Sequence, residues 1–323
     1  MHPSPSDSPF LGPTRPVDVT VVGSTNVDVT ATVPRLPGRG ETLLGTSLLS
    51  SPGGKGANQA LAASRGGASV RFVGAVGNDD AAPTALSHLQ ADGVDLSAVL
   101  TREGVPTGTA LIWVEDSAEN SIVVVPGANG SITAQDVDRV AERGGLEGVV
   151  LLQGEIPAEA VTRAAERAPG RVVVNLAPVI EVPPRVLTAA DPLIVNEHEG
   201  AEALRILGGD PKGASEEEVV VALLAAGVPS VVMTLGARGA LVADDSGVRA
   251  TPAARVRAVD TTGAGDAFVG AAAARLAEGA DLGAAASYAA RFAAGAVLRA
   301  GTQSSYPLRG AELPELIAEG PTC

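Results

Sequence analysis

The chain has 323 residues, of which 45% are hydrophobic and 19% charged, with a formal net charge of −14 and a pI near 4.7. This length and apolar content suffice for one large α/β domain, or for a core domain with a smaller unit. The acidic balance, with no run of Lys or Arg, argues against nucleic acid as a partner, because affinity for nucleic acid depends on neutralising phosphates. The single cysteine, Cys323, is the last residue, which excludes an intrachain disulfide and suits a cytoplasmic protein.

Residues 1–16 are rich in Pro and Ser and lack the apolar core of a signal peptide, so we expect a disordered leader before a domain at 17–323. The uncharged run 219–237 is long enough to raise the question of a membrane span. Gly227 and Pro229 interrupt it, however, and the pattern is typical of a helix end, a turn and a strand. We therefore expect no membrane segment.

Short apolar runs that end in turn residues alternate with helical patterns along most of the chain. The strands expected from these runs are 17–23, 69–77, 148–154, 171–178, 192–196 and 230–236. The expected helices are 53–67, 81–93, 157–168 and 196–207, with two Ala-rich helices within 263–299. This alternation predicts an α/β fold, a three-layer core with a mostly parallel central sheet flanked by helices.

Two stretches, 28–50 and 107–125, depart from this alternation of strands and helices. Each alternates apolar and polar residues, as half-exposed strands do, and neither contains a helical pattern. They predict a small β-sheet outside the main sheet, which we interpret as a lid.

The segment 260–266, "DTTGAGD", places flexible glycines and then a carboxylate ahead of an Ala-rich helical run. Asp266 fits an ordinary helix start, since an acid in the first turn complements the helix dipole. It also fits a phosphoryl-transfer site, in which the free N–H groups of residues 263–265 hold an anion and Asp266 accepts a proton from an attacking hydroxyl. The motif alone leaves both interpretations open.

The loop 52–58, "PGGKGAN", opens a predicted helix and is either a plain turn or a cradle that presents Lys55 and Asn58 to a polyol. Asn26 and Asp28 follow the first strand, at the edge where ligands bind in α/β sheets, although both residue types are also common in turns. Neither the Walker pattern nor the G-x-G-x-x-G fingerprint is present, which argues against a P-loop ATPase and a nicotinamide dehydrogenase.

Together, these motifs resemble those of the ribokinase-like (PfkB) sugar kinases. The matching segments occur in the family's order and span about 23–307: "GSTNVD", "GGKGANQA", "NLAP", "NEHE", "TLGARGA", "DTTGAGDAF" and "GTQSSYP". The resemblance implies an α/β core with a β-sheet lid that closes over a sugar and through which two chains form a homodimer. It also implies transfer of the γ-phosphoryl group of ATP to a primary hydroxyl, which is O5 if the sugar is ribose.

The resemblance also assigns roles to individual residues. Asp266 would be the catalytic base, and the anion hole would be Gly263, Ala264 and Gly265. The sugar would bind to Asn26, Asp28, Gly54, Lys55, Asn58, Glu155 and Asp266. The nucleotide would bind to Asn196, Thr234, Leu235, Gly236, Ala237, Arg238, Gly239 and Gly265.

Two cation sites are implied in the same way. Glu199 would place Mg²⁺ through water, although it also fits a solvated helix glutamate. A monovalent cation, K⁺, would be held by Asp260, Thr262, Ala296, Arg299, Gly301 and Ser305. The sequence departs from the family at Ala290, where His or Asn often lies beside adenine, and this predicts weaker contacts to the base.

Ribose is the favoured acceptor, with 2-deoxyribose, fructose or a related sugar as alternatives. Only 2% of the residues are aromatic, which argues against a nucleoside, and the lid stretch offers a sugar phosphate only Arg35 and Arg39. A catalytically inactive sugar-binding protein is the alternative from another class, and turnover of ATP with a sugar would exclude it.

Overall fold

The computed structural model describes residues 16–115 and 120–316. Residues 1–15 of the predicted leader, residues 116–119 of the predicted lid and Cys323 lie outside the described residues.

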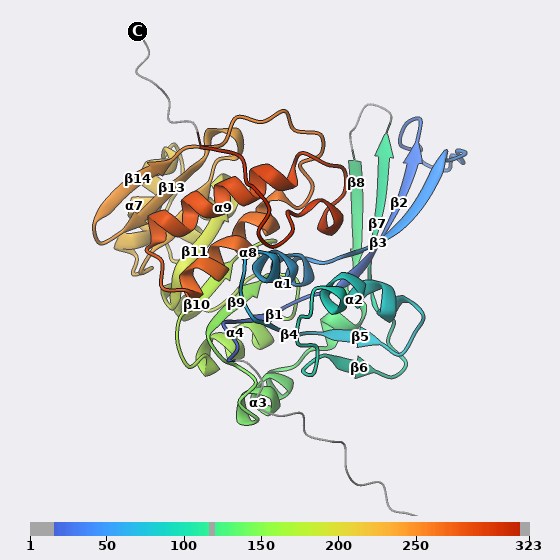
Figure 1. Ribbon diagram of the computed structural model, residues 1–323, viewed down its shortest axis with the longest axis horizontal. Helices are drawn as coiled ribbons and strands as arrows, with labels where there is room; N and C mark the ends of the chain where they lie inside the picture. The colour runs from blue at the N-terminus through green and yellow to red at the C-terminus, as the bar shows by residue number, and fades with distance from the viewer. Residues whose placement is uncertain (1–15, 116–119, 317–323) are drawn as a thin grey trace, which may run out of the picture.

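Within the described residues, eight strands form the central sheet in the order β14-β13-β12-β11-β10-β9-β1-β4 (Figure 1). The six strands from β12 to β4 run parallel, and β13 and β14 are antiparallel at one edge. Their bounds are β1 (Val19–Val22), β4 (Val70–Val73), β9 (Val149–Gln153), β10 (Val172–Asn175), β11 (Ala190–Asn196), β12 (Val231–Thr234), β13 (Ala240–Asp244) and β14 (Gly247–Thr251). The prediction of a mostly parallel central sheet is confirmed.

Helices cover both faces of this sheet (Figure 1). One face packs against α1 (Lys55–Arg65), α8 (Ala264–Ala277) and α9 (Leu282–Ala296). The other face packs against α3 (Ala134–Glu142), α4 (Ala158–Arg167), α5 (Pro184–Thr188), α6 (Glu197–Ile206) and α7 (Glu216–Ala225). A further helix, α2 (Ala81–Ala91), packs against α1 and the small sheet.

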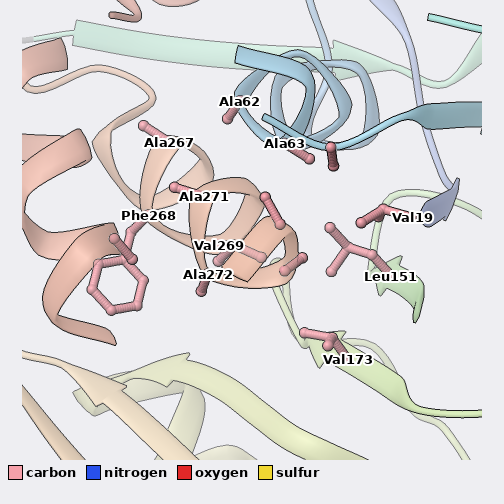
Figure 2. Packing of buried hydrophobic residues seen from close by; sticks show 14 of the residues in the cluster. Val19, Ala62, Ala63, Leu151, Val173, Ala267, Phe268, Val269, Ala271 and Ala272 are labelled. Carbon is pink, nitrogen blue, oxygen red and sulfur yellow. The ribbon is translucent and has the colours of Figure 1, made fainter. Parts of the chain in front are cut away.

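Successive residues of the central strands point to opposite helical layers, because side chains alternate across a strand. Val149 and Leu151 of β9 pack toward α1 and α8, whereas Val150 and Leu152 pack toward the opposite layer. Figure 2 shows Leu151 with Val19 and Val173 facing the small side chains of α1 and α8. The alanines of these two helices allow a close approach, which places the N-terminal turn of α8 against α1.

A separate four-stranded sheet stands outside the core, in the order β3-β2-β7-β8 (Figure 1). Its strands are β2 (Asn26–Val33), β3 (Ser47–Gly53), β7 (Gly108–Glu115) and β8 (Asn120–Val125). β2 and β7 run parallel, and the other pairs are antiparallel. The small sheet expected from 28–50 and 107–125 is therefore present, and we refer to it as the lid sheet.

The predicted strand 69–77 is wrong in one respect, since the structure divides it between two sheets. β4 ends at Val73, and β5 (Ala75–Gly77) pairs with β6 (Leu100–Arg102) in a separate two-stranded sheet. Gly74 lies between them, where a Cβ atom would come within 2.5 Å of the Phe72 ring. Only a glycine fits the close approach of the chain to that ring, and the strand bends there. The β13–β14 hairpin is a second element that the sequence patterns did not predict.

The uncharged run 219–237 is divided as predicted. α7 ends at Ala225, Gly227 follows with φ 97°, and β12 begins at Val231. None of the helices in the described part of the chain is long and apolar enough to cross a bilayer.

Candidate active site

Polar side chains that end three neighbouring strands meet at one edge of the central sheet. Gln153 is the last residue of β9, Asn175 of β10 and Asn196 of β11. The carboxyl ends of parallel strands share an edge, and this is where ligands bind in open α/β sheets. The first turns of α1 and α8 reach the same place, since Lys55 and Asp266 line a cavity with Asn175 and Asn196.

Asp266 lies in the first turn of α8 and is only 7% exposed. Its carboxylate accepts two hydrogen bonds from α1, one on Oδ2 from Asn58 Nδ2 (2.9 Å) and one on Oδ1 from Gln59 Nε2 (2.8 Å). Helix packing rather than a loop therefore fixes this carboxylate. Asn58, predicted from the resemblance to bind sugar, contacts the predicted base, and its Oδ1 accepts from Gln303 Nε2 (2.9 Å).

The N-terminus of α8 has no side-chain cap. The N–H of Ala264 donates to the carbonyl of Thr261 (3.2 Å), whereas those of Gly263 and Gly265 have no acceptor among the described residues. Unpaired N–H groups at the positive end of a helix dipole favour an anion. Two of the three predicted anion-hole residues thus offer a free donor.

The two glycines of this turn differ in what surrounds them. Gly263 has a left-handed φ of 73°, and a Cβ atom there would lie 2.3 Å from Thr302 Cγ2. Its carbonyl accepts a hydrogen bond from the buried Tyr306 hydroxyl (3.0 Å). Gly265, by contrast, has no atom within 4 Å of its Cβ position apart from its chain neighbours and the backbone of its own helix. Gly263 is required by the backbone, whereas Gly265 leaves open space.

The central cavity, of about 170 Å³, gathers opposite charges. The Asp266 carboxylate raises the pKa of the Lys55 ammonium, with smaller contributions from Glu155 and Glu199, against the effect of burial. Burial raises the pKa of Glu199, although the carboxylate accepts a hydrogen bond from the Asn196 N–H (2.9 Å). Glu199 and Asn196 form the capping box of α6, so both side chains are held in place at the cavity wall.

A second cavity, of about 290 Å³, lies between the lid sheet and the strand ends, and Asn26, Val124 and Glu155 are among its lining residues. Glu155 Oε2 accepts from Ser24 Oγ (2.6 Å) and from the N–H of Lys55 (3.0 Å). Because Lys55 lines the central cavity, these hydrogen bonds connect the two cavities.

Asp28 belongs to the lid strand β2 and is half-buried. Its carboxyl packs over Gly53, where a Cβ atom would lie 2.2 Å from Asp28 Oδ2. Burial, together with repulsion from Glu155 and Asp266, raises the pKa of Asp28 to about 6. A ligand that donates hydrogen bonds to this carboxylate would stabilise its charged form, which burial and the neighbouring charges disfavour.

Asn129 was not among the residues predicted for the site. It is 1% exposed and donates from Nδ2 to Asn26 Oδ1 (2.8 Å) and to the carbonyl of Thr25 (3.0 Å). Since the Asn26 oxygen is occupied, the Asn26 amide group is turned so that its N–H₂ remains available to a ligand. Asn129 lies in a short loop turn, 127–131, and nothing in its sequence surroundings indicates this contact.

A third cavity, of about 300 Å³, shares Thr234 and Gly265 with the central one. The predicted nucleotide-binding residues Gly236, Ala237 and Gly239 line it, as does Ala290. Other lining residues are mostly small and apolar: Ala253, Ala254, Val256, Ala258, Ala264, Phe268, Ala293, Ala294 and Val297.

Two further residues predicted to bind nucleotide make other contacts in this structure. Among the described lining residues of the third cavity, neither Leu235 nor Arg238 is present. Leu235 packs on the core beneath it. The exposed guanidinium of Arg238 pairs instead with Glu197 (2.8 Å) and Glu216 (2.9 Å) on α6 and α7.

The two segments predicted to hold a monovalent cation lie side by side. Asp260 accepts from the N–H of Thr262 on Oδ1 (2.9 Å) and from that of Gly301 on Oδ2 (2.9 Å). The Val297 carbonyl accepts from the N–H groups of Val259 (2.8 Å) and Asp260 (3.3 Å). The hydroxyl of the buried Ser305 donates to the carbonyl of Thr302 (2.9 Å). The structure thus brings 260–262 and 297–305 together beside the start of α8.

Four further polar residues of the site were missed, and two of them carried a signal. Gln153 and Asn175 each end an otherwise apolar buried strand, and a polar residue there points to the ligand-bearing edge of the sheet. Gln59 sits within a helical run and Gln303 in a loop, so their convergence on the site follows only from the tertiary packing.

A mostly parallel α/β sheet, a β-sheet over its carboxyl edge and a buried carboxylate at an uncapped helix N-terminus are features of a small-molecule kinase. Residues 17–309 match the family model described as pfkB family carbohydrate kinase. The chain is 36% identical to the ribokinase of Bacillus subtilis, an alignment that covers 93% of this chain and 99% of that one. It is also 36% identical to the deoxyribokinase of Salmonella typhi, with 90% and 96% coverage.

A comparison with a solved structure also places this chain among the sugar kinases. The Arabidopsis thaliana ribokinase, complexed with ribose and ATP, superposes with a TM-score of 0.81 at 30% identity, over 91% of this chain and 96% of the other. The chain therefore belongs to the pfkB family of carbohydrate kinases. It is an ATP-dependent sugar kinase.

Proposed function

We propose that this kinase transfers the γ-phosphoryl group of ATP to O5 of D-ribose, with Asp266 as the base. The observation that carries the proposal is the environment of Asp266, a buried carboxylate beside unpaired N–H groups of α8 and the Lys55 ammonium. The similarity to ribokinases, one of them solved with ribose and ATP, supports this choice of acceptor and donor.

The chemistry follows from these groups. Oxygen O5 attacks the γ-phosphorus, its proton passes to Asp266, and the bond from phosphorus to the β,γ-bridging oxygen breaks to release ADP. A loose transition state spreads negative charge over the transferring phosphoryl oxygens. The N–H groups of Gly263 and Gly265 are placed to stabilise that charge, and each donor of this kind typically contributes about 3 kcal/mol.

The sugar would bind in the cavity under the lid sheet, which Asn26 and Glu155 line, with Asp28 two residues beyond Asn26 on β2. Asn26 offers N–H donors because Asn129 occupies its oxygen, whereas the two carboxylates offer acceptors. A polyol presents both donors and acceptors, and a hydroxyl left unpaired in a closed site costs about 1–3 kcal/mol. This mixed lining suits a polyhydroxylated acceptor.

The nucleotide would occupy the third cavity, with its triphosphate directed toward α8. The described residues contain no cluster of three or more His, Cys, Asp or Glu that could hold a metal alone. Glu199 and Asn196 at the central cavity fit Mg²⁺ that is carried by the phosphates, since this ion keeps several waters and takes few protein carboxylates. When bound, Mg²⁺ neutralises charge on the β- and γ-phosphate oxygens.

The monovalent cation is assigned to the junction of 260–262 and 297–305. One carboxylate, that of Asp260, lies there among backbone carbonyls and the Ser305 hydroxyl. Oxygen donors with a single negative charge fit K⁺, which would fix these loops beside the start of α8.

The lid sheet is also proposed as a dimer interface. Thr30, Leu49, Ile112 and Ile122 form a row across it, on the face that carries Asp28. Leu49 is 63% exposed and Ile122 is 53% exposed. An exposed apolar row of this kind marks an interaction site, and we assign it to the lid sheet of a second copy.

2-Deoxyribose is the second candidate acceptor, because the deoxyribokinase relative is as similar to the chain as the ribokinase is. One contact to the 2-hydroxyl would separate the two sugars.

Coupled measurement of ADP release with Mg-ATP and a panel of sugars, with and without K⁺, tests the proposal. We expect the highest kcat/KM with D-ribose, activation by K⁺, and loss of turnover in a folded Asp266→Asn variant. A higher kcat/KM with 2-deoxyribose or another sugar than with D-ribose would make that sugar the assigned acceptor. Sugar binding without any turnover would favour the inactive sugar-binding protein.

A further inference from the structure

Two series of buried carboxamides converge on the two oxygens of Asp266. In the first, Gln153 Nε2 donates to Gln59 Oε1 (2.8 Å), and Gln59 Nε2 donates to Asp266 Oδ1 (2.8 Å). In the second, Gln303 Nε2 donates to Asn58 Oδ1 (2.9 Å), and Asn58 Nδ2 donates to Asp266 Oδ2 (2.9 Å). All four amide residues are buried, none being more than 6% exposed.

Chemistry fixes the direction of both series. An ionised carboxylate only accepts hydrogen bonds, so Asn58 and Gln59 must turn their N–H₂ groups toward Asp266. Their carbonyl oxygens then face the protein interior and need donors, which Gln303 and Gln153 supply. A reversed outer amide would oppose two carbonyl oxygens in a buried site, where an unpaired polar group is costly.

The outer oxygens, Gln153 Oε1 and Gln303 Oε1, are buried and accept no hydrogen bond from the described residues. The Gln303 backbone is held instead, since Arg65 Nη1 donates to its main-chain carbonyl (2.9 Å) and fixes the 303–305 turn against α1. Gln59 Nε2 also lies 2.9 Å from Asn175 Oδ1, and Asn175 Nδ2 donates to the carbonyl of Ile194 (2.9 Å). Strand ends and a loop turn therefore support the carboxylate through α1.

We propose that Gln59 and Gln303 are positioning residues for the catalytic base, Gln59 directly and Gln303 through Asn58. The inference rests on the proposed role of Asp266. With one amide N–H on each oxygen, the carboxylate has a fixed plane and keeps its remaining lone pairs for the acceptor hydroxyl. Among the described residues, neither glutamine lines any of the three cavities, so neither is placed to bind sugar or nucleotide.

Kinetics of Gln59→Met and Gln303→Met test the inference, since methionine keeps the length of the side chain and removes the N–H donor. Gln59→Met removes a hydrogen bond to the Asp266 carboxylate, and Gln303→Met removes one to Asn58, which orients that carboxylate. We expect each variant to lower kcat by about 10-fold or more and to leave the KM values for ribose and ATP unchanged. The matched control is Gln135→Met, an exposed position on α3, which leaves all parameters unchanged. Unchanged kcat in both variants, or a loss confined to KM, would overturn the assignment.

A second measurement does not depend on turnover. The free energy of unfolding in urea is compared for the parent, Gln303→Met, Asp266→Asn and the double variant. We expect Gln303→Met to destabilise the parent more than it destabilises Asp266→Asn, because a carboxamide at position 266 accepts either orientation of Asn58. If the changes in unfolding free energy of the two single variants simply add in the double variant, Gln303 does not act on Asp266 through Asn58, and the inference is rejected. If the parent turns over sugar and both glutamine variants match it, the inference fails while the proposed function stands.

Discussion

At the residue scale, Asp28 shows how the site is prepared for a ligand. Its carboxyl lies in the lid strand near Glu155 and Asp266, and its pKa is raised to about 6 from an ordinary value of 3.8. Two further carboxylates and the desolvated position disfavour its charge. The local sequence around Asp28 does not indicate this pKa, because Glu155 and Asp266 are distant from it along the chain, and only the family resemblance placed the three carboxylates in one site.

This pKa predicts a pH-dependent stability. Between about pH 4 and pH 6 the folded chain keeps the Asp28 proton that the unfolded chain has lost, so stability falls as the pH rises through this window. At about 1.4 kcal/mol per pKa unit, the loss at pH 7.5 is roughly 3 kcal/mol. Asp28→Asn carries no charge and should therefore be more stable than the parent by that amount at pH 7.5, and about equal to it near pH 4.

Urea unfolding of both proteins from pH 4 to pH 7.5 measures the difference. A difference that stays constant over this range would contradict the raised pKa. The same variant should raise the KM for ribose, since the carboxylate is assigned to the sugar. Asp244→Asn should change stability in the opposite direction, because Arg249 and Ser246 hold the pKa of that half-buried carboxyl down at about 2.

At the element scale, the start of α8 contains one glycine that the backbone requires and one that it does not. Gly263 adopts a left-handed conformation in contact with Thr302, whereas Gly265 has free space at its Cβ position. The sequence motif presents the two glycines as equivalent. The surrounding loop 302–306 makes them different, since it packs against Gly263 only.

The pair Gly263→Ala and Gly265→Ala should therefore separate stability from activity. Gly263→Ala is expected to lose at least about 1–2 kcal/mol of unfolding free energy, the cost of a left-handed alanine, with the Thr302 overlap in addition. Gly265→Ala should be as stable as the parent or gain up to about 1 kcal/mol, since alanine is the better helix former.

The new methyl group of Gly265→Ala would enter the space shared by the central cavity and the third cavity, which is proposed for the nucleotide. We expect a raised KM for ATP and a lower kcat, measured by ADP release, in a protein that melts normally. Parent-like ATP kinetics in this variant would show that the space beside Gly265 is not used by the nucleotide.

At the scale of the whole molecule, the lid sheet stands apart from the three-layer core (Figure 1). Its row of Leu49, Ile112 and Ile122 lies on the face that carries Asp28, so a second copy on this row would also cover the proposed sugar site. The proposed dimer and the closed sugar site would thus share one surface.

Ile122→Asp should dissociate the dimer, because it places a charge in the apolar row. Val123→Asp is the matched control, since Val123 is the next residue, 51% exposed, and points to the opposite face of the lid sheet. Sedimentation velocity should give a monomer for Ile122→Asp and a dimer for both the parent and the control. The interface is misassigned if the parent is a monomer or if both substitutions act alike.

Local patterns were sufficient for much of this protein. The alternation of apolar strands and helices predicted the mostly parallel sheet, and the polar-apolar alternation of 28–50 and 107–125 predicted the lid sheet. The glycines ahead of Asp266 predicted a helix start with free donors, and the structure has one. These features depend on residues a few positions apart, where backbone conformation and side-chain period are set by the local sequence.

The surroundings of Asp266 were decided by the tertiary structure. Gln59, Asn129 and Gln303 reach the site from segments far apart in the chain. The exposed Arg238 guanidinium pairs with Glu197 and Glu216. The break at Gly74 likewise depends on how close the chain passes to the Phe72 ring. Strand order and the packing of α1 on α8 set these contacts. The sequence motifs therefore predicted Asp266 as the candidate base, and only the packed core determined which groups hold its carboxylate.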